Sequence, residues 1–383
     1  MKMRYALLSA VILFAACKKD DIPADNAPAP MGKVSGRVVA ANNTTPVRNA
    51  TVFIAKGADI YHTYTDVNGN FLLEAPAGQH ELHIQSGSGS IFRTKMTVQV
   101  VAEQTTPVAT NAVKLTQVAS LAYVPGTYDK IESIIMDSLG YNASGINTNT
   151  LHVLSQLTQY NAIFINCSSS VPVDWVQDSV LATYVANGGS IYTSDYAVAA
   201  LIGTHGGSCP NPRQGGFIPD SKLCTQRIGN TGMIYNAQII SPVLQTYLNK
   251  FFMNITYNLG AWETVMNYDA NYWEVMVRHP ATQAPLLLRT NAFTNASAGT
   301  VNIGSSTNSN MVIICHKPQG TTPVTITVPA ADLAMHLAHG DTQGSCNSAN
   351  GAGRIYYTTF HNEPNGQISP DMKNILEYMI LNL

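Results

Sequence analysis

The chain carries near its end the stretch Gly353-Arg354-Ile355-Tyr356-Tyr357-Thr358-Thr359-Phe360-His361-Asn362-Glu363. β-Branched and aromatic residues follow a glycine here, and this composition predicts a strand. The predicted strand ends in His361 and Glu363. A histidine and a carboxylate can act as base and orienting acid where a nucleophile lies within reach. The question for the rest of the chain is whether another strand end supplies that nucleophile.

Upstream of this stretch, apolar strands alternate with amphipathic helices. We predict strands at 120–124, 162–166 and 190–193, and helices at 128–139, 148–158 and 175–186. The run at 162–166 is continuously apolar, as expected for a parallel strand buried on both faces. Such alternation calls for a parallel sheet with right-handed crossovers. Residues 119–383 are therefore predicted to form a doubly wound, flavodoxin-like α/β domain with β-rich and disulfide-bounded insertions, at 204–231 and 311–348.

Residues 119–205 and 353–383 resemble the class I glutamine amidotransferase-like fold, and within it the trehalose-utilisation-like branch. The resemblance is carried by Gly188-Gly189, the strand and turn at 190–196, and the stretch 353–363 with the predicted helix 370–381. It implies a nucleophile on the turn that follows the strand at 190–193. The family's Gly-x-Cys-x-Gly is replaced by Tyr192-Thr193-Ser194-Asp195-Tyr196. Asp195 thus takes the nucleophile's position with Ser194 beside it, while His361 and Glu363 match the family's His-x-Glu.

These departures favour a binding or structural role over catalysis, although enzymatic activity stays open. The loop that is glycine-rich in the family, where it donates oxyanion hydrogen bonds, reads Asn166-Cys167-Ser168-Ser169-Ser170. The alternative is a divergent hydrolase or carbohydrate-processing enzyme that uses Asp195 or Ser194 with His361 and Glu363. In either case the carboxyl ends of the strands are the expected binding edge of an open α/β sheet.

Residues 32–116 show short strands and turns without helical periodicity, which predicts a small antiparallel β-sandwich. Asn68-Gly69 is a typical hairpin turn, because its residues readily adopt positive φ angles. The order Val34-x-Gly36, Pro46-Val47, Asp66-x-x-Gly69 and Pro76-x-Gly78 resembles the carboxypeptidase regulatory-like, transthyretin-like domain. That resemblance implies a non-catalytic module used as an N-terminal spacer.

The first residues have the pattern of a secretory signal. Lys2 and Arg4 precede an apolar run at 6–16, which is too short to span a membrane, and Cys17 follows. Residues 14–17 resemble a bacterial lipobox, which implies removal of 1–16, lipidation of Cys17 and a tether over 17–31. An ordinary signal peptide with a chance cysteine is the alternative. The acidic pair at 20–21 resembles surface-exported lipoproteins, so we expect a lipid anchor in the Gram-negative outer membrane, facing the cell surface.

Composition limits the class of partner. The chain has 383 residues, of which 11% are charged, and a formal net charge of −2. Nucleic acid is therefore an unsuitable partner, because phosphate binding needs a concentrated basic patch. An exported protein favours disulfides, and the local pairs are Cys209–Cys224 and Cys315–Cys346, with Cys167 left over.

A second local motif lies in the insertion at 311–348. It reads Cys315-His316-Lys317-Pro318, then His336-Leu337-Ala338-His339-Gly340-Asp341, then Cys346. This resembles a short module of secreted bacterial proteins that brings no established activity. A helix at 330–338 would place His336 and His339 on one face. His316, His336, His339 and Asp341 would then suit zinc or another divalent transition metal; a disulfide-stapled knob without metal is the alternative.

Aromatic residues cluster at 262–273. Trp262, Tyr272 and Trp273 offer the flat faces and hydrogen-bonding tips that bind glycans. Packing inside a hairpin core is the alternative interpretation of the same residues.

Overall fold

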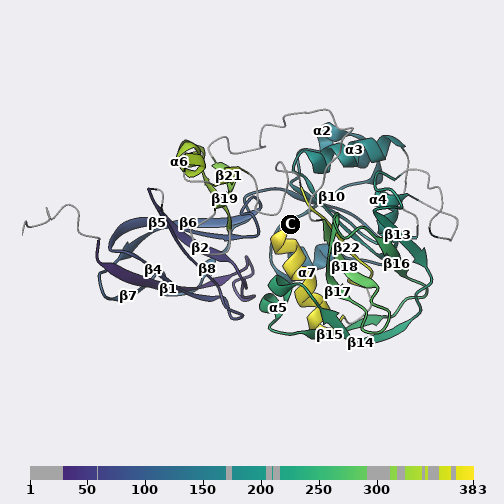
Figure 1. Ribbon diagram of the computed structural model, residues 1–383, viewed down its shortest axis with the longest axis horizontal. Helices are drawn as coiled ribbons and strands as arrows, with labels where there is room; N and C mark the ends of the chain where they lie inside the picture. The colour runs from purple at the N-terminus through teal and green to yellow at the C-terminus, as the bar shows by residue number, and fades with distance from the viewer. Residues whose placement is uncertain are drawn as a thin grey trace, which may run out of the picture.

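The computed structural model describes residues 29–57, 59–169, 175–203, 209, 216–290, 311–316, 324–338, 341–343, 353–363 and 368–383. The expected signal segment, Cys17 and most of the expected tether lie outside these residues, as do His339 and Cys346. A β-sheet body and a larger α/β body lie side by side (Figure 1). Within the described residues, no helix is long and apolar enough to cross a membrane.

The N-terminal body consists of two small sheets and is sandwich-like. One sheet has the order β4-β1-β7, with β8 also paired to β1, and the other has the order β3-β2-β5-β6. Their bounds are β1 Met31–Val39, β2 Thr51–Lys56, β3 Asp59–Tyr64, β4 Asn70–Pro76, β5 Gly78–Ser86, β6 Phe92–Val100, β7 Thr105–Pro107 and β8 Val113–Lys114. The expected antiparallel pairing is incomplete, because β1 pairs with β7 and β8 in parallel.

The expected hairpin turn before β4 is present. Asp66 Oδ1 accepts hydrogen bonds from the backbone nitrogens of Asn68 and Asn70, at 2.9 and 2.8 Å. Gly69 adopts a φ of 79°, which favours glycine. The aspartate therefore shapes the turn through its own backbone neighbours.

The α/β body is built on a nine-stranded sheet of order β10-β9-β11-β12-β22-β18-β17-β14-β15. The first five strands run parallel, and their bounds are β9 Leu121–Val124, β10 Ser144–Gly145, β11 Ala162–Ile165, β12 Ser190–Ser194 and β22 Ile355–Thr358. From β9 the chain goes to β10 on one side and then to β11 on the other. This reversal is the topological switch point at which such sheets bind ligands.

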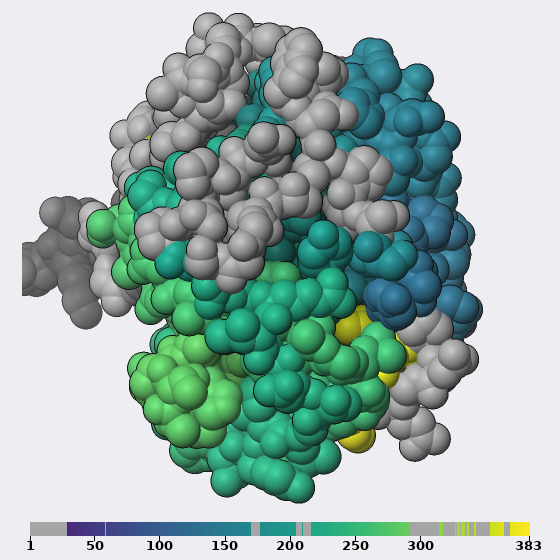
Figure 2. Space-filling model, turned by 90° about the vertical axis from the view of Figure 1, so that its right-hand side faces the viewer, coloured from purple at the N-terminus to yellow at the C-terminus, as the bar shows by residue number. Residues whose placement is uncertain are grey.

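The other four strands extend the sheet beyond β22 through antiparallel pairs, which makes the sheet mixed. They are β14 Gly232–Ile239, β15 Phe252–Tyr257, β17 Trp273–Arg278 and β18 Pro285–Thr290. The sequence predicted β-rich insertions here but not that these strands extend the central sheet. Segment 216–290 forms much of the surface seen from the end of the molecule opposite the sandwich (Figure 2).

Helices cover both faces of the sheet. α3 Trp175–Ala186 and α4 Ala199–Ile202 pack on the face that carries Ile163 and Ile191. α5 Pro242–Leu248 and α7 Pro370–Asn382 pack on the opposite face, with Phe164 and Tyr192. Successive residues of a strand thus enter different cores, as the alternation of side chains requires.

The two helices expected at 128–139 and 148–158 are shorter than expected, and the second is broken. The first consists of a short α1 Ile131–Ser133 and a π-helical turn Ile134–Ser138. The second consists of a 3₁₀ turn Thr148–His152 and α2 Leu154–Leu157, separated by Val153 in an extended conformation with φ −126°. The extended Val153 interrupts the ladder of hydrogen bonds, so the two pieces of the second helix stay one or two turns long.

The two bodies share buried contacts. Asn42 Nδ2 donates to the carbonyl of Ser138 at 2.6 Å, and the Phe92 and Tyr141 rings lie 4.5 Å apart. One continuous apolar cluster includes residues of both bodies. The sandwich is therefore packed against the α/β body.

The histidine-containing insertion forms a unit that we call the histidine module, residues 311–316, 324–338 and 341–343. It has a sheet of order β20-β19-β21 and a helix, with bounds β19 Met311–His316, β20 Val324–Pro329, α6 Leu333–Ala338 and β21 Thr342–Gln343. Ile314, Ile326 and Val328 pack against Phe53 of β2. The module therefore lies on the sandwich, although in the sequence it is an insertion of the predicted α/β domain (Figure 1).

Candidate functional site

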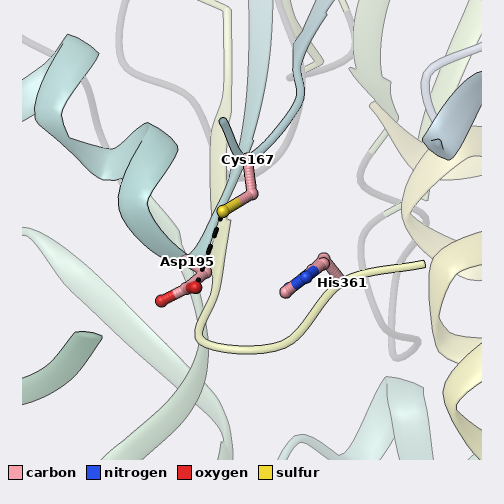
Figure 3. A group of neighbouring side chains, drawn as sticks. All are labelled: Cys167, Asp195 and His361. Carbon is pink, nitrogen blue, oxygen red and sulfur yellow. Dashed lines mark hydrogen bonds between the residues drawn. The ribbon is translucent and has the colours of Figure 1, made fainter. Parts of the chain in front are cut away.

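Three side chains from three strand ends meet at the carboxyl edge of the parallel sheet. Cys167 follows β11, Asp195 follows β12 and His361 follows β22. Because β11, β12 and β22 are adjacent and parallel, their carboxyl ends lie at one edge. We call these three residues the edge cluster; their side chains point toward one another (Figure 3).

The edge cluster is compact and buried. One sulfur, one carboxylate oxygen and one imidazole nitrogen all lie within 4.8 Å of one another. Cys167 Sγ donates to Asp195 Oδ2 at 3.5 Å. Cys167 is 1% exposed, and Asp195 and His361 are each 6% exposed.

Asp195 sits on a strained turn. It has a φ of 44°, a left-handed conformation that is uncommon for a residue with a side chain. The turn leads from β12 straight into a 3₁₀ helix at Asp195–Val198. The backbone nitrogen of Glu263 donates to Asp195 Oδ1 at 2.7 Å, which fixes one carboxylate oxygen and leaves Oδ2 toward Cys167.

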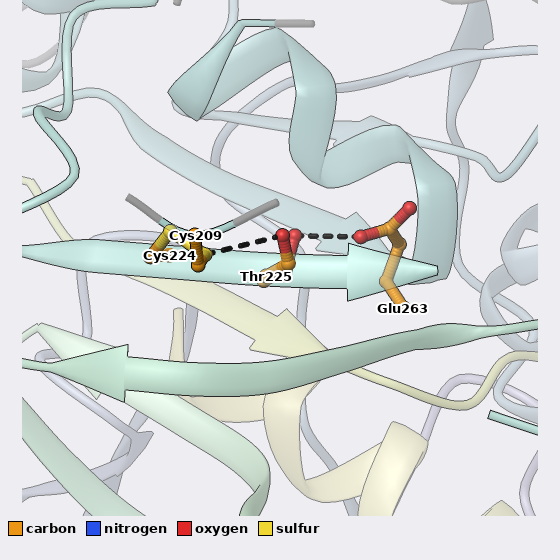
Figure 4. Close-up of a disulfide and its surroundings, with 4 residues drawn as sticks. All are labelled: Cys209, Cys224, Thr225 and Glu263. Atoms are coloured by element: carbon orange, nitrogen blue, oxygen red, sulfur yellow. Dashed lines mark hydrogen bonds between the residues drawn. A yellow bond between two sulfur atoms is a disulfide. The ribbon is translucent and has the colours of Figure 1, made fainter. Parts of the chain in front are cut away.

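A two-stranded sheet supports this turn from the side. β13 Leu223–Arg227 pairs with β16 Glu263–Tyr268. Thr225 Oγ1 donates to Glu263 Oε2 at 2.6 Å (Figure 4). The expected disulfide Cys209–Cys224 is present beside Thr225, with its Cα atoms 6.0 Å apart. Thr225, which lies in the first insertion, therefore positions Glu263, and the Glu263 backbone nitrogen in turn binds Asp195.

Ser194 is held by hydrogen bonds to Asp129 and Cys167. Its Oγ donates to Asp129 Oδ2 at 2.5 Å and accepts from the backbone nitrogen of Cys167 at 3.2 Å. Asp129 Oδ1 accepts from the backbone nitrogen of Asn362 at 3.1 Å. Burial raises the pKa of Asp129 to about 7. The hydrogen bond from Ser194 lowers this pKa, but by less than burial raises it. Asp129 thus ties the β9, β12 and β22 ends together.

His361 lacks the hydrogen-bonded partner that a triad needs. Among the described residues, neither ring nitrogen has a hydrogen bond of normal geometry. Burial lowers the pKa of His361 to about 4, and the backbone of Tyr128 opposes this only in part, so the ring is neutral at pH 7. Glu363 Oε1 instead accepts from the backbone nitrogen of Asn258 at 3.2 Å. The catalytic roles of Asp195, Ser194, His361 and Glu363 stay predictions.

The thiol of Cys167 is not activated as a nucleophile. Burial, together with the nearby Asp195 carboxylate, raises the pKa of Cys167 well above its usual value. Burial also raises the pKa of Asp195 to about 6. At neutral pH the edge cluster therefore combines a protonated thiol, a carboxylate and a neutral imidazole.

Two residues at the carboxyl edge, Cys167 of the edge cluster and Asp129 beside Ser194, are not among the site residues expected from the sequence. Cys167 follows the predicted strand at 162–166, so attention to the carboxyl ends of the parallel strands would have selected it. Asp129 carried a weaker signal, because it lies five residues after β9 inside a stretch that reads as helical.

A second buried group of side chains lies in the histidine module. His316 Nδ1 and His336 Nδ1 lie 2.8 and 2.9 Å from the same oxygen, Asp341 Oδ2. All three residues are buried, and they form a group that could hold a metal ion. His339, the fourth expected ligand, and Cys346 lie outside the described residues. Cys315 is disulfide-bonded, and its pairing with Cys346 stays a prediction.

The aromatic cluster divides by exposure. Trp273 is 1% exposed and belongs to the core on one face of the sheet, so its ring is not available on the surface. Trp262 is half-buried, stacks on Tyr257 with centroids 4.1 Å apart, and donates from Nε1 to the carbonyl of Asn230. Tyr272 lies under Lys222 Nζ at 5.8 Å. Trp262 and Tyr272 are thus the two expected glycan-binding rings with exposed surface.

The fold and site define a mixed α/β protein with a buried polar cluster at the carboxyl edge, joined to a sandwich-like body. No family model matches the chain, and no curated protein sequence matches it. Among solved structures, a DUF3823 family protein from Parabacteroides merdae is 18% identical with a TM-score of 0.19, covering 23% of this chain and 47% of that chain. The chain thus spans about half the length of that protein.

A putative ThuA-like protein from Bacteroides uniformis is 10% identical with a TM-score of 0.34. This likeness covers 68% of the present chain and 89% of the other. Similarity this low carries no argument about function, so the function is argued from the geometry of the site.

Proposed function

We propose that this chain is a lipid-anchored protein of the Gram-negative outer membrane, facing the cell surface, that binds a glycan or another envelope component without catalysing its conversion. The observation that carries the proposal is the turn after β12. Ser194 is held by Asp129, and Asp195 is held by the Glu263 backbone nitrogen, so both residues at the nucleophile's position are tied into the fold. Hydrogen bonds of this kind suit a rigid binding edge better than an attacking group.

Anchoring is tested with Cys17→Ser in the full chain. We expect the variant to move from the membrane fraction to the soluble fraction, and protease added to intact cells to cut the wild-type protein. Cys167→Ser is the matched cysteine control and should stay in the membrane fraction. A Cys17→Ser protein that remains membrane-bound would contradict the anchor.

Glycan binding is tested on a glycan array with the wild-type chain, Trp262→Ala and Tyr272→Ala. Both rings keep part of their surface exposed for contact with a sugar, although Trp262 also stacks on Tyr257. We expect binding to at least one glycan class and its loss in one of the variants. Failure of the wild-type chain to bind any glycan would remove this ligand class from the proposal.

The histidine module would hold a divalent transition metal, with zinc as the first choice. His316, His336 and Asp341 place two imidazole nitrogens around one carboxylate oxygen at 2.8 and 2.9 Å. A tetrahedral zinc ion needs about 3.4 Å between such donors, so the three groups would separate by roughly half an ångström on binding. Without an ion, the same contacts are hydrogen bonds that keep the donors together.

Metal in the module is tested by elemental analysis of protein purified without chelator. We expect stoichiometric zinc, copper or nickel, and the loss of one ion per chain in Asp341→Asn and in His336→Ala. His279→Gln changes a histidine in an exposed turn and should keep the full metal content. Wild-type protein without stoichiometric transition metal would rule the site out.

The divergent hydrolase remains the alternative, because Asp195 has the strained φ of 44° that a nucleophile on a strand-to-helix turn adopts. Its test is a screen with ester and glycoside substrates. Turnover by the wild-type chain that is abolished in Asp195→Asn would favour the enzyme over the binding protein.

A further inference from the structure

We propose that the edge cluster, Cys167, Asp195 and His361, is a binding site for a divalent transition metal ion, with zinc as the preferred ion. This site is separate from the histidine module, because its three donors come from the ends of β11, β12 and β22 in the α/β body. Thiolate, carboxylate and imidazole are the three donor types that zinc takes in proteins. Magnesium and calcium prefer sites made of oxygen alone.

The measured spacing fits a tetrahedral ion. Cys167 Sγ and Asp195 Oδ2 lie 3.5 Å apart. With a zinc–sulfur bond of about 2.3 Å and a zinc–oxygen bond of about 2.0 Å, tetrahedral angles place the two donors about 3.5 Å apart. The longest donor–donor distance in the cluster is no more than 4.8 Å, so His361 needs to approach by at most about 1.5 Å to reach tetrahedral spacing.

His361 supplies an independent reason to expect a ligand. Its ring is 6% exposed, and neither nitrogen makes a hydrogen bond of normal geometry to the described residues. Burying a polar group without a partner costs free energy, so such groups in folded proteins point to a missing ligand, ion or water. A metal ion between His361 and the other two donors satisfies one nitrogen directly.

The supporting hydrogen bonds leave the required donor atoms toward the site. The Glu263 backbone nitrogen donates a hydrogen bond to Asp195 Oδ1. Asp195 Oδ2 therefore faces Cys167 Sγ. The strained conformation of Asp195 then has a role, since it turns the carboxylate toward Cys167 and His361. Partners that orient metal ligands in this way commonly tune a metal site.

The charges of the ion and its ligands also balance, and each proton released on binding is accounted for. The Cys167 thiol gives up its proton to solvent as the sulfur–metal bond forms, and the Asp195 carboxylate and neutral His361 bind without proton transfer. One thiolate and one carboxylate offset the two positive charges of the ion, which makes the buried site neutral. A neutral site avoids the free-energy cost of an unpaired charge. Three protein ligands match the number at catalytic zinc sites, which keep one position for water or a ligand.

Cobalt(II) provides a probe that separates the edge cluster from the histidine module. Cobalt bound to a thiolate absorbs in the near ultraviolet by sulfur-to-metal charge transfer, whereas cobalt bound to histidine and aspartate does not. Among the described cysteines, Cys167 is the free one, and Cys209, Cys224 and Cys315 are disulfide-bonded. The full chain is stripped with chelator, without reductant, and titrated with cobalt while absorbance and proton release are recorded.

We expect the wild-type chain and Asp341→Asn to show the charge-transfer band and to release one proton per ion bound at this site. We expect Cys167→Ser to lose the band and His361→Ala to bind cobalt about tenfold more weakly or worse. Thermal unfolding checks that both variants are folded. If Cys167→Ser does not fold, His361→Ala and the wild-type spectrum decide the outcome.

Absence of the band in the wild-type chain, or its persistence in folded Cys167→Ser, would overturn the proposal. The histidine module is judged separately. Its failure would appear as unchanged metal content in Asp341→Asn, whatever the charge-transfer band does.

Discussion

At the scale of single residues, the decisive feature is that a buried carboxyl group, Asp129, organises the turn after β12. It accepts from Ser194 Oγ and from the Asn362 backbone nitrogen. Ser194 is therefore held in the fold by Asp129, while Asp195 faces Cys167. The chemistry of the site follows from which neighbour each side chain faces.

Asp129→Asn should change the pH dependence of stability. Burial raises the pKa of Asp129 from 3.8 to about 7 in the folded chain. The folded state then binds the proton more tightly than the unfolded state, so this contribution is fully present below pH 3.8 and is lost as pH rises through about 7. We expect the free energy of unfolding of the wild type, relative to Asp129→Asn, to fall by up to about 4 kcal/mol between pH 4 and pH 8.

The measurement is denaturant unfolding of both proteins across that pH range. Asp137→Asn is the control, because Asp137 is an exposed aspartate on the following helical turn. A wild-type minus Asp129→Asn difference that is flat between pH 4 and pH 8 would contradict the raised pKa.

At the scale of elements, the two-stranded sheet β13–β16 is the support of the site. It carries Thr225 and Glu263, whose side chains are hydrogen-bonded to each other, and the Glu263 backbone nitrogen reaches Asp195. The Cys209–Cys224 disulfide closes a short segment of chain onto β13. The insertion at 204–231, which resembles a surface loop in the sequence, therefore contributes to the carboxyl edge through strand β13 and its pairing with β16.

Replacing Cys209 and Cys224 together by alanine should lower the free energy of unfolding by about 3 kcal/mol, as the chain-entropy model gives for a closed loop of 15 residues. Denaturant unfolding measures the change. Cobalt titration of the same double variant shows whether the edge cluster weakens with its support. A stability equal to that of the wild type would show that the disulfide adds nothing to the fold.

At the scale of the whole molecule, the histidine module is attached to the sandwich through Phe53. This ring is buried, packs against Ile314, Ile326 and Val328, and stacks on His83 with centroids 4.8 Å apart. His62 on the neighbouring strand β3 has its pKa lowered by burial and, to a smaller extent, by His316. The module and the sandwich therefore form one packed unit.

Phe53→Ala should loosen the module, because removing a buried phenylalanine costs about 3–5 kcal/mol. We expect faster hydrogen exchange of the β19 and β20 amides, and weaker metal retention by the module if it holds an ion. Leu73→Ala, in the other sheet of the sandwich, is the matched core control and should leave module exchange closer to that of the wild type. Equal protection of β19 and β20 in wild type and Phe53→Ala would show that this contact does not hold the module.

The sequence alone determined the type of most elements and where several of them lie. A continuous apolar run predicted the buried strand β11, the short stretch after Gly188-Gly189 predicted β12, the stretch after Gly353 predicted β22, and the local pair Cys209–Cys224 was predicted from spacing. These features depend on neighbours along the chain, which is why composition and periodicity reveal them. The sequence also selected Asp195 and His361, through the resemblance of 190–196 and 353–363 to the amidotransferase-like fold.

Only the tertiary structure decided which of these groups meet. That β14, β15, β17 and β18 extend the central sheet, that the histidine module packs on Phe53, and that Ser194 turns to Asp129 all depend on pairings between residues far apart in sequence. Such pairings are set by the packing of whole faces and by strand register, and local periodicity does not encode them. For the same reason Cys167 joined Asp195 and His361 only once β11, β12 and β22 were in place, since three strand ends become one site by lying side by side.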